Sequence, residues 1–340
     1  MTAPANTARH RRNAQLTALI AGVSLFIGAG IGLLQAAPDA RLTGVAVGGL
    51  MGVTIAVGCT LSDLYIFSNA GRRWTRRLPP VRLLALRALT YSAVILVALA
   101  LPGVLSDAPP LWRDPDIPRS FAIAAAIAVL VSTGVELNRL LGPEATRGLL
   151  TGRYSRPQIE DRVVLIADVV GSTALAERIG DLEFHSFLQE VAYDLAEPIY
   201  ATRGNVHAYV GDATIVTWPL DQGLADGACL NCARAMHGAL AEAAPRYQAR
   251  FGSAAALRIA IHAGPVAAGE MGDWKIAIAL LGDTMNTAAR LEGAARVNNV
   301  GTVLSDVVAS GLPDAARGPL RALPDFTAAG KGTALTLWAA

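Results

Sequence analysis

The sequence predicts an α+β protein in which a helical membrane bundle is followed by an α/β sandwich. Of its 340 residues, 53% are hydrophobic and only 16% are charged, and the mean hydropathy of +0.40 exceeds that of an ordinary soluble globule. The apolar excess is concentrated in long runs before residue 137. The rest of the chain alternates short β-branched runs with helical patterns, and pairs of helices between antiparallel strands fit an α/β sandwich.

Residues 1–137 are predicted to form a membrane domain with four transmembrane helices, at about 14–36, 42–66, 84–105 and 119–137. Arginines cluster before the first helix and between the second and third, at Arg9–Arg12 and Arg72–Arg82, whereas aspartates outnumber arginines in the loop before the fourth. By the positive-inside rule, the N-terminus and everything after the fourth helix lie in the cytoplasm. The sequence thus predicts a multi-pass protein of the cell (inner) membrane.

Glycines recur on the faces of the first two predicted helices, where they would let the helices approach closely. They are Gly28, Gly30 and Gly32 in the first helix and Gly44, Gly48, Gly49 and Gly52 in the second. The partners expected of this domain are membrane lipids and an unidentified ligand or protein that it senses. Nucleic acid is not expected, because the net charge is only +2 and no basic, aromatic-containing tract occurs.

Residues 138–160 are predicted to be a helical linker, with Gly142-Pro143 and Arg156-Pro157 as breaks on either side of a short helix. This segment is the only covalent route between the two halves, so we expect it to transmit rearrangements of the membrane helices. Residues 161–340 form the predicted catalytic domain. Its expected elements are a strand at 163–168, helices across 172–203, hairpin strands at 205–210 and 213–218, a helix within 221–248, strands near 256–262 and 276–281, a helix at 284–297 and a strand at 301–305.

Asp168 lies where the predicted strand ends and a helix begins. The turn between them offers backbone amides, and its Ser or Thr is expected to cap the helix. A carboxylate beside such amides suits a metal-bound phosphate. A second carboxylate, Asp212, follows Gly211 in the predicted hairpin turn, where it can meet Asp168. The turn residues are Gly171, Ser172 and Thr173.

Amide and cationic side chains that suit phosphate lie further along the chain. Asn286 and Arg290 are four residues apart and therefore share one face of the predicted helix 284–297. An amide and a guanidinium on one face suit a phosphorane-like transition state. The turn Gly330-Lys331-Gly332 supplies another cation.

These stretches resemble, in order, the motifs of the class III nucleotidyl cyclase catalytic domain, also called the adenylate and guanylate cyclase homology domain. The motifs are ADVVGST, YVGD, LRIAIHAGPV, LLGDTMNTAARLE and GKG, and the resemblance covers about half of the chain, from roughly Tyr154 to the end. It implies a ferredoxin-like α/β domain that works as a homodimer. It also implies two divalent metal ions, Mg²⁺ or Mn²⁺, held by Asp168 and Asp212 with the Val169 carbonyl as a further ligand.

The resemblance also implies a role for each remaining site residue. Asn286 would orient the ribose and Arg290 would bind the charge that develops on the α-phosphate, both donated by the partner subunit. The other phosphates would be bound by turn residues and one lysine, namely Gly171, Ser172, Thr173, Gly211 and Lys331. These roles predict an adenylate cyclase, which converts ATP to 3′,5′-cyclic AMP and pyrophosphate by two-metal-ion catalysis.

The choice of purine is not encoded where this family usually encodes it. Members specific for ATP commonly have a Lys four residues before the second metal aspartate, and an Asp or Thr three residues before the glycine that opens the Asn-Arg helix. Ala208 and Ala279 occupy these positions, and neither side chain can form a hydrogen bond with a base. The nearby polar residues His207 and Lys275 are candidates for a substitute role. Two alternatives stay open: a guanylate cyclase that uses GTP, or a membrane receptor with a catalytically weak cyclase-like dimerisation module.

Overall fold

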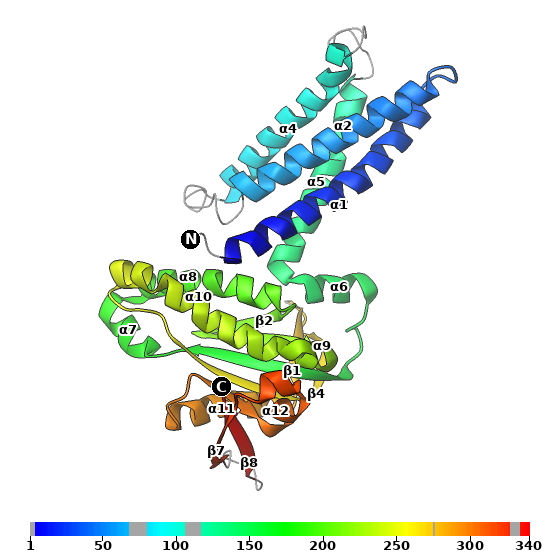
Figure 1. Ribbon diagram of the computed structural model, residues 1–340. Helices are drawn as coiled ribbons and strands as arrows, with labels where there is room; N and C mark the ends of the chain where they lie inside the picture. Colours follow the sequence, from blue (N-terminus) through cyan, green and yellow to red (C-terminus); the bar gives the residue numbers. More distant parts are fainter. Residues whose placement is uncertain (1–3, 68–79, 106–116, 275, 327–333) are drawn as a thin grey trace. The chain divides into compact units, whose positions relative to one another are not determined.

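The computed structural model of the chain describes residues 4–67, 80–105, 117–274, 276–326 and 334–340. The chain forms two compact units, Met1–Glu136 and Leu137–Ala340, drawn as a ribbon in Figure 1. The described part of the first unit is helical, and the second unit combines helices with a β-sheet. The boundary between the units lies next to residue 137, where the predicted membrane domain ends.

Four α-helices make up the described part of the first unit. They are α1 (Pro4–Gln35), α2 (Arg41–Leu61), α4 (Pro80–Leu105) and α5 (Ile117–Leu141), and the π-helical turn η1 (Ser62–Ile66) continues α2. Two of these helices are long and apolar enough to cross a bilayer, through the stretches Thr17–Leu34 and Arg41–Leu61. The apolar stretches of α4 and α5 are shorter, Ala85–Ala100 and Phe121–Leu130. Each predicted span thus overlaps a helix, but among the described residues only the first two contain an apolar stretch long enough to cross a bilayer.

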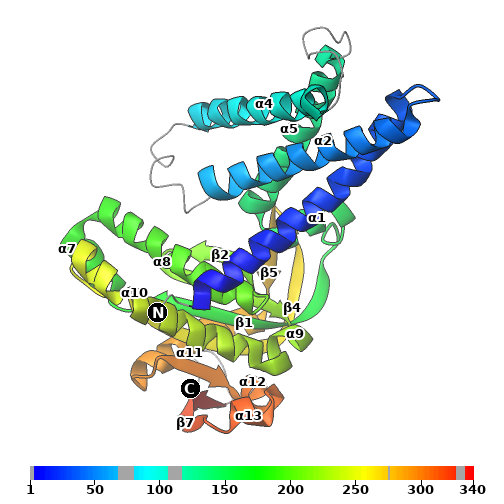
Figure 2. The ribbon, with the colours of Figure 1, turned by 45° about the horizontal axis from the view of Figure 1, so that its top comes forward.

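Helices α1 and α2 pack against each other through glycine backbones, and Figure 2 shows the two helices side by side. A Cβ atom placed on Gly28 would lie 2.2 Å from the carbonyl oxygen of Gly48, and one on Gly32 would lie 2.0 Å from that of Gly44. No other residue fits at such distances. The predicted close approach is therefore confirmed for these glycines, whereas Gly30 faces open space.

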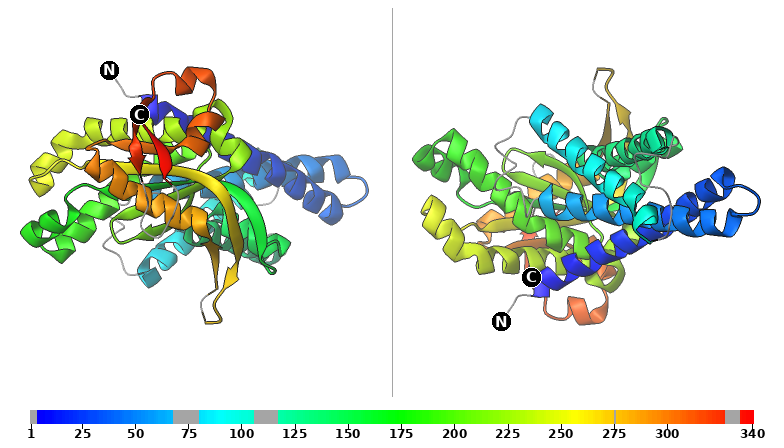
Figure 3. Two further views of the ribbon diagram at one scale, coloured as in Figure 1. Left: turned by 90° about the horizontal axis from the view of Figure 1, so that it is seen from below. Right: turned by 90° about the horizontal axis from the view of Figure 1, so that it is seen from above.

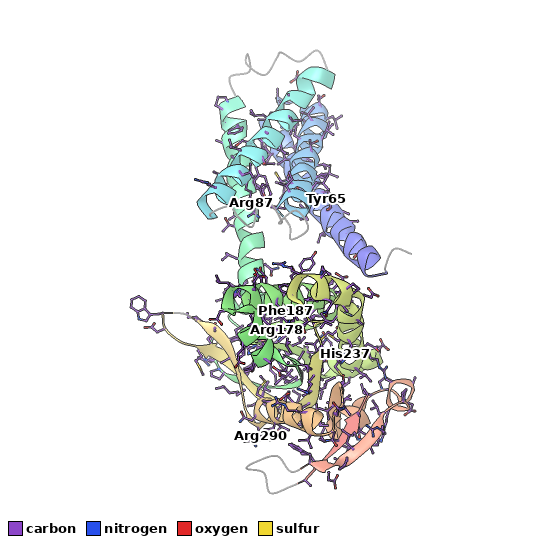
Figure 4. All side chains as sticks on the ribbon, turned by 90° about the vertical axis from the view of Figure 1, so that its left-hand side faces the viewer. Tyr65, Arg87, Arg178, Phe187, His237 and Arg290 are labelled. Atoms are coloured by element: carbon purple, nitrogen blue, oxygen red, sulfur yellow. The ribbon has the colours of Figure 1, made fainter. Side chains whose placement is uncertain are left out.

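A polar contact inside the first unit involves Asp63 of η1. The hydroxyl of Tyr91 donates a hydrogen bond of 2.6 Å to the Asp63 carboxylate, and Arg87 Nε lies 3.2 Å from its other oxygen. The guanidinium of Arg87, labelled in Figure 4, also lies 5.3 Å from the centre of the Phe67 ring. The acid at this helix end is therefore paired within the protein.

The second unit is built on a sheet of eight strands in its described part. They are β1 (Gln158–Val169), β2 (Asn205–Val210), β3 (Ala213–Pro219), β4 (Leu257–Met271), β5 (Ala277–Leu281), β6 (Thr302–Ser305), β7 (Arg321–Phe326) and β8 (Leu335–Ala339). The strand order is β2-β3-β1-β4-β6-β8-β7, with β5 paired to β4. Strands β2, β3, β1 and β4 pair antiparallel with one another, whereas β6 is parallel to β4, so the sheet is mixed.

Helices cover both faces of this sheet, as Figure 3 shows in two views. Alternate residues of β1 divide between the faces, because side chains alternate along a strand. Val163 and Leu165 pack with residues of α8 (Asp181–Ala201) and α10 (Ala228–Phe251), whereas Val164 and Ile166 pack against α11 (Asp283–Val297). The order β1, α8, β2, β3, α10, β4 gives the ferredoxin-like βαββαβ arrangement that the resemblance implied.

The helices predicted across 172–203 are α7 (Ser172–Ile179) and α8, which are separated at Gly180, with a φ of 80°. The structure differs from the sequence-based expectations in two places. Strand β1 begins at Gln158, inside the predicted linker, and the helix expected there is α6 (Pro143–Thr151). Beyond residue 305, where no element was expected, lie α12 (Asp306–Gly311), α13 (Asp314–Arg317), β7 and β8.

Candidate active site

Two carboxylates meet where the central strand β1 ends. Ala167 of β1 pairs with Thr214 of β3, so Asp168 lies opposite Ala213, the residue that follows Asp212. Gly211 has a φ of 61°, in the region that favours glycine, and the Gly211-Asp212 turn connects β2 to β3. The register of the sheet therefore brings the Asp212 turn beside Asp168.

The electrostatics of Asp168 reflect this proximity. Burial of the half-buried side chain and the negative charge of Asp212 raise the pKa of Asp168 to about 6. The charge of Glu292 and a hydrogen bond with Asp212 act in the same direction, and the charge of Arg296 opposes them. A divalent cation would relieve the like-charge repulsion in such a pair.

Sequence reasoning did not single out Glu292. It lies in α11, and its side chain, 16% exposed, forms an i,i+4 ion pair of 3.2 Å with Arg296. Nothing in the local sequence distinguishes this pair from an ordinary helix-surface pair, so only the fold reveals its closeness to Asp168. In the described part of the chain, no group of three or more His, Cys, Asp and Glu residues is arranged to hold a metal ion. The site thus offers a pair of aspartates.

The turn after β1 leads directly into α7. Gly171, with a φ of 71°, is the N-cap residue, and Ser172 and Thr173 are the first residues of the helix. The prediction that Ser or Thr caps this helix is therefore wrong, because the cap residue is a glycine and no side chain forms a capping hydrogen bond. The amides of a first helical turn have no partners within the helix, so they face outward for an anion. The Val169 side chain is buried in the core. Val169 is the last residue of β1, and it pairs with Leu257 of β4.

Asn286 and Arg290 point away from the sheet of their own chain. Both are exposed, and they lie on the side of α11 opposite its buried residues Thr284, Thr287, Ala288, Leu291, Ala294 and Ala295. Neither side chain forms a hydrogen bond or ion pair with another described side chain. Figure 4 labels Arg290 on α11 and Phe187 on α8, on opposite sides of the sheet. Within one chain, the pair therefore does not converge on Asp168.

A β-bulge lies in the first half of β2, next to Ala208. The pairing of β2 with β3 shifts between Val206 and Ala208, so His207 is the extra residue of the bulge. Burial lowers the pKa of His207, the charge of Glu144 opposes this, and the charge of Arg162 supports it. Of the other predicted site residues, Ala279 pairs with Gly269 in the β4–β5 hairpin. Lys275 and Lys331 lie outside the described residues.

A cavity of about 260 Å³ lies between α8 and the β2–β3 hairpin. Its walls include His185, Gln189, Tyr209 and Asp212, but Asp168 is not among its lining residues. This cavity is therefore not the place where the two aspartates meet.

The chain is similar to known proteins along most of its length. A family model described as the adenylate and guanylate cyclase catalytic domain matches residues 155–316. The chain is 36% identical over 272 residues to adenylate cyclase 2 of Rhizobium meliloti (strain 1021), in a match that covers 76% of this chain and 74% of that protein. It is 25% identical to the membrane guanylyl cyclase of Dictyostelium discoideum, over 50% of this chain and 11% of that much longer protein.

Among solved structures, the chain is similar to a bacterial light-regulated adenylyl cyclase. The match has a TM-score of 0.54 and 19% sequence identity, and it covers 64% of this chain and 63% of that one. At this identity the likeness concerns the fold, and it agrees with the mixed sheet and ferredoxin-like core of the second unit.

Proposed function

The chain belongs to the adenylate and guanylate cyclase family and is therefore an enzyme, and from that premise we propose that it is a membrane-anchored, homodimeric adenylate cyclase. The ribose 3′ oxygen of ATP loses its proton and forms a bond to the α-phosphorus, the bond from that phosphorus to the bridging oxygen breaks, and pyrophosphate leaves with the released proton taken up by it or by solvent. The meeting of Asp168 with Asp212 at the end of β1 is the observation that carries this proposal. The identity to an adenylate cyclase over three quarters of the chain supports the choice of ATP.

Two divalent metal ions, Mg²⁺ or Mn²⁺, are the proposed cofactors, held by Asp168, Asp212 and the Val169 carbonyl. When bound, they would neutralise the charge on the attacking and leaving oxygens. The residues fit this role, because the two carboxyl groups are close enough to interact. Burial also disfavours the negative charge of Asp168 unless a cation is bound. Mg²⁺ is usually bound by one or two carboxylates together with substrate phosphates, which matches a site with two aspartates.

The remaining roles are proposed for the turns and for α11. The outward-facing amides after Gly171, at Ser172 and Thr173, and the Gly211 turn bind the β- and γ-phosphates. Asn286 orients the ribose and Arg290 binds the charge on the α-phosphate. Lys331 is proposed as a further phosphate ligand from its sequence position alone.

A homodimer is proposed because Asn286 and Arg290 point away from their own sheet. A second copy of the chain, related by two-fold symmetry, would present these side chains to the paired aspartates of its neighbour. The β4–β5 hairpin, which projects from the second unit in Figure 3, offers an apolar contact for this assembly. Its exposed side chains include Met271, Trp274 and Ile276. Exposed apolar residues gathered on one hairpin are typical of an interaction surface.

Membrane anchoring is proposed from the two long apolar stretches of α1 and α2. Four spans, with the N-terminus and the catalytic unit in the cytoplasm, remain the topology that the distribution of arginines favours. A cytoplasmic catalytic unit would have access to the cellular nucleotide pool. A ligand or protein sensed by the membrane unit stays a proposal without an identified partner.

The direct test is a product assay. The purified full-length chain in lipid nanodiscs is incubated with Mn²⁺ and either ATP or GTP, and cyclic nucleotide is measured. Cyclic AMP from ATP is the expected product. A preference for GTP would support the guanylate cyclase alternative, which Ala208 and Ala279 keep open. A folded protein that forms no product from either nucleotide would instead be a cyclase-like dimerisation module.

A further inference from the structure

One carboxylate of helix α6 bonds to two strands of the sheet. Glu144, in the first turn of α6, accepts hydrogen bonds from Arg162 of β1, from the Tyr154 hydroxyl at 2.7 Å and from the Asn205 amide of β2. Its side chain is only 22% exposed. The chain runs from α5 through Gly142 into α6, so Glu144 lies close to the start of the second unit.

The charge of this anchor is balanced by a buried arginine. Arg162 is 4% exposed, and its guanidinium bonds to Glu144, Glu160 and, at 3.4 Å, the Thr217 hydroxyl. Burial alone would raise the pKa of Glu144, but hydrogen bonds and the charge of Arg162, with Tyr154 and Asn205, lower it on balance. Glu144 is therefore an ionised acceptor, and it ties β1 to β2 across the intervening strand β3.

The tie to β2 lies immediately before the bulge at His207. Asn205 pairs with Thr217, and Ala208 pairs with Ile215, so the extra residue between them places Asn205 and Ala208 on the same face. A bulge that moved by one residue would turn Ala208 to the opposite face, because side chains alternate along a strand. β2 lies at the edge of the sheet, where it has one neighbouring strand to fix its position.

We propose that Glu144 is a positioning residue for the nucleotide site, which holds Asn205 and thereby fixes the bulge that directs His207, Ala208 and the following Asp212 turn. This inference rests on the proposed cyclase function, and it makes α6 a part of the site rather than a spacer. Displacement of α6 withdraws the carboxylate from Asn205 and loosens β2, while Arg162 keeps its bond to Glu160. The tie thus links the position of α6 to purine selection and to the second metal aspartate.

The test compares variants that break the tie with one that does not. Asn205→Leu removes the β2 donor and leaves every charge in place, and Glu144→Leu removes the acceptor. Glu160→Leu is the matched control, because Glu160 also bonds to the buried Arg162 but not to β2. Thermal unfolding of each full-length variant confirms folding, and KM and kcat are measured with ATP and with GTP. If Glu144→Leu does not fold, Asn205→Leu carries the test alone, since it retains both carboxylates around Arg162.

For Asn205→Leu, we expect kcat/KM with the preferred nucleotide to fall by about ten- to a hundredfold, because misplacement of a site by an ångström has effects of this size. The ratio of kcat/KM for the two purines should also shift, whereas Glu160→Leu should change neither quantity by more than about twofold. Asn205→Asp should also impair the enzyme by placing two carboxylates together. Adding Glu144→Gln to Asn205→Asp restores a donor and an acceptor, and should recover activity.

Wild-type kinetics in a folded Asn205→Leu variant, or equal losses in Asn205→Leu and Glu160→Leu, would overturn the inference while the cyclase function stands. Hydrogen exchange gives a readout that does not depend on turnover. Amides 206–212 should exchange faster in Asn205→Leu and not in Glu160→Leu. If the wild type makes no cyclic product, the proposed function fails, and the exchange pattern alone decides whether Glu144 positions the hairpin.

Discussion

Asp168 and Asp212 lie side by side at the end of β1, where burial of Asp168 and the charge of Asp212 raise the pKa of Asp168 to about 6. In the metal-free protein, the pair therefore holds a proton below about pH 6. A divalent cation that binds both carboxylates has to displace this proton. Metal binding and protonation are thus competing ways to relieve the same repulsion.

The first prediction concerns pH. We expect the apparent affinity of the full-length chain for Mn²⁺ to be constant above about pH 7 and to fall by up to about tenfold per pH unit below about pH 6, because one proton is displaced. Calorimetric Mn²⁺ titrations between pH 5 and 8 measure this. An affinity that does not depend on pH over this range would contradict the pairing.

The stability of the metal-free protein should depend on pH in the sense opposite to that of the Mn²⁺ affinity. The pKa of Asp168 is raised above its ordinary value of 3.8, so the native state holds the proton more tightly than the unfolded chain does. This contribution to stability is present at low pH and is lost as the pH rises through about 6. Asp212→Asn is the control, because it removes the neighbouring charge and should lower the pKa of Asp168 towards its ordinary value.

The second prediction concerns shared sites. Asp168→Asn and Arg290→Ala should each abolish cyclase activity, because one removes a proposed metal ligand and the other removes the charge proposed to stabilise the transition state. When the two variants are mixed, half of the dimers carry one intact site of two, so about a quarter of wild-type activity should return. The measurement is cyclic product from co-expressed, differently tagged chains.

The matched control combines two defects on the same side of the site. Asp168→Asn mixed with Asp212→Asn places a damaged aspartate pair in every site, so no activity should return. Recovery in this control would show that the two aspartates of one site come from different subunits. No recovery with Arg290→Ala in isolated mixed dimers would show that the aspartates and the arginine come from the same subunit.

The sequence predicted those parts of the fold that local patterns determine. The buried run before Asp168, the Gly211-Asp212 turn and the Asn286-Arg290 helix each have a period or a turn signal within a few residues. The ferredoxin-like order came from the resemblance to a family, since the pairing of β1 with both β3 and β4 is not a local property. The close contact of α1 with α2 could also be predicted locally, because glycines at helical spacing can be recognised directly in the sequence.

Other features could not be predicted because they depend on contacts between distant segments. Glu292 acts on Asp168 from another element, and Glu144 acts on Asn205 and Arg162, with no signal in the sequence around any of them. Strand β8 is specified by its pairing with β6 and β7 rather than by a long apolar run. The bulge at His207 contains no glycine that would mark it in the sequence.

The third prediction concerns the glycine contact in the first unit. Gly48→Ala places a Cβ 2.3 Å from the carbonyl oxygen of Gly28, so α1 and α2 must separate. We expect a loss of about 1–3 kcal/mol in unfolding free energy, the usual effect of overpacking. Gly30→Ala is the matched control, because nothing lies within 4 Å of its added Cβ, and it should be neutral or slightly stabilising. Denaturation in detergent micelles measures both, and equal effects would contradict the close contact.

The last prediction concerns the base. Burial lowers the pKa of His207, so its imidazole is neutral near pH 7 and can both donate and accept a hydrogen bond, as the edge of a purine requires. His207→Ala should therefore reduce the ratio of kcat/KM for the preferred purine over the other by about five- to tenfold, the effect of one lost hydrogen bond. His207→Gln, which keeps a donor and an acceptor, should retain most of the preference. Because the imidazole is already neutral, the preference should not change between about pH 7 and 8. If the double variant His207→Ala, Lys275→Ala keeps the wild-type ratio, neither residue selects the base.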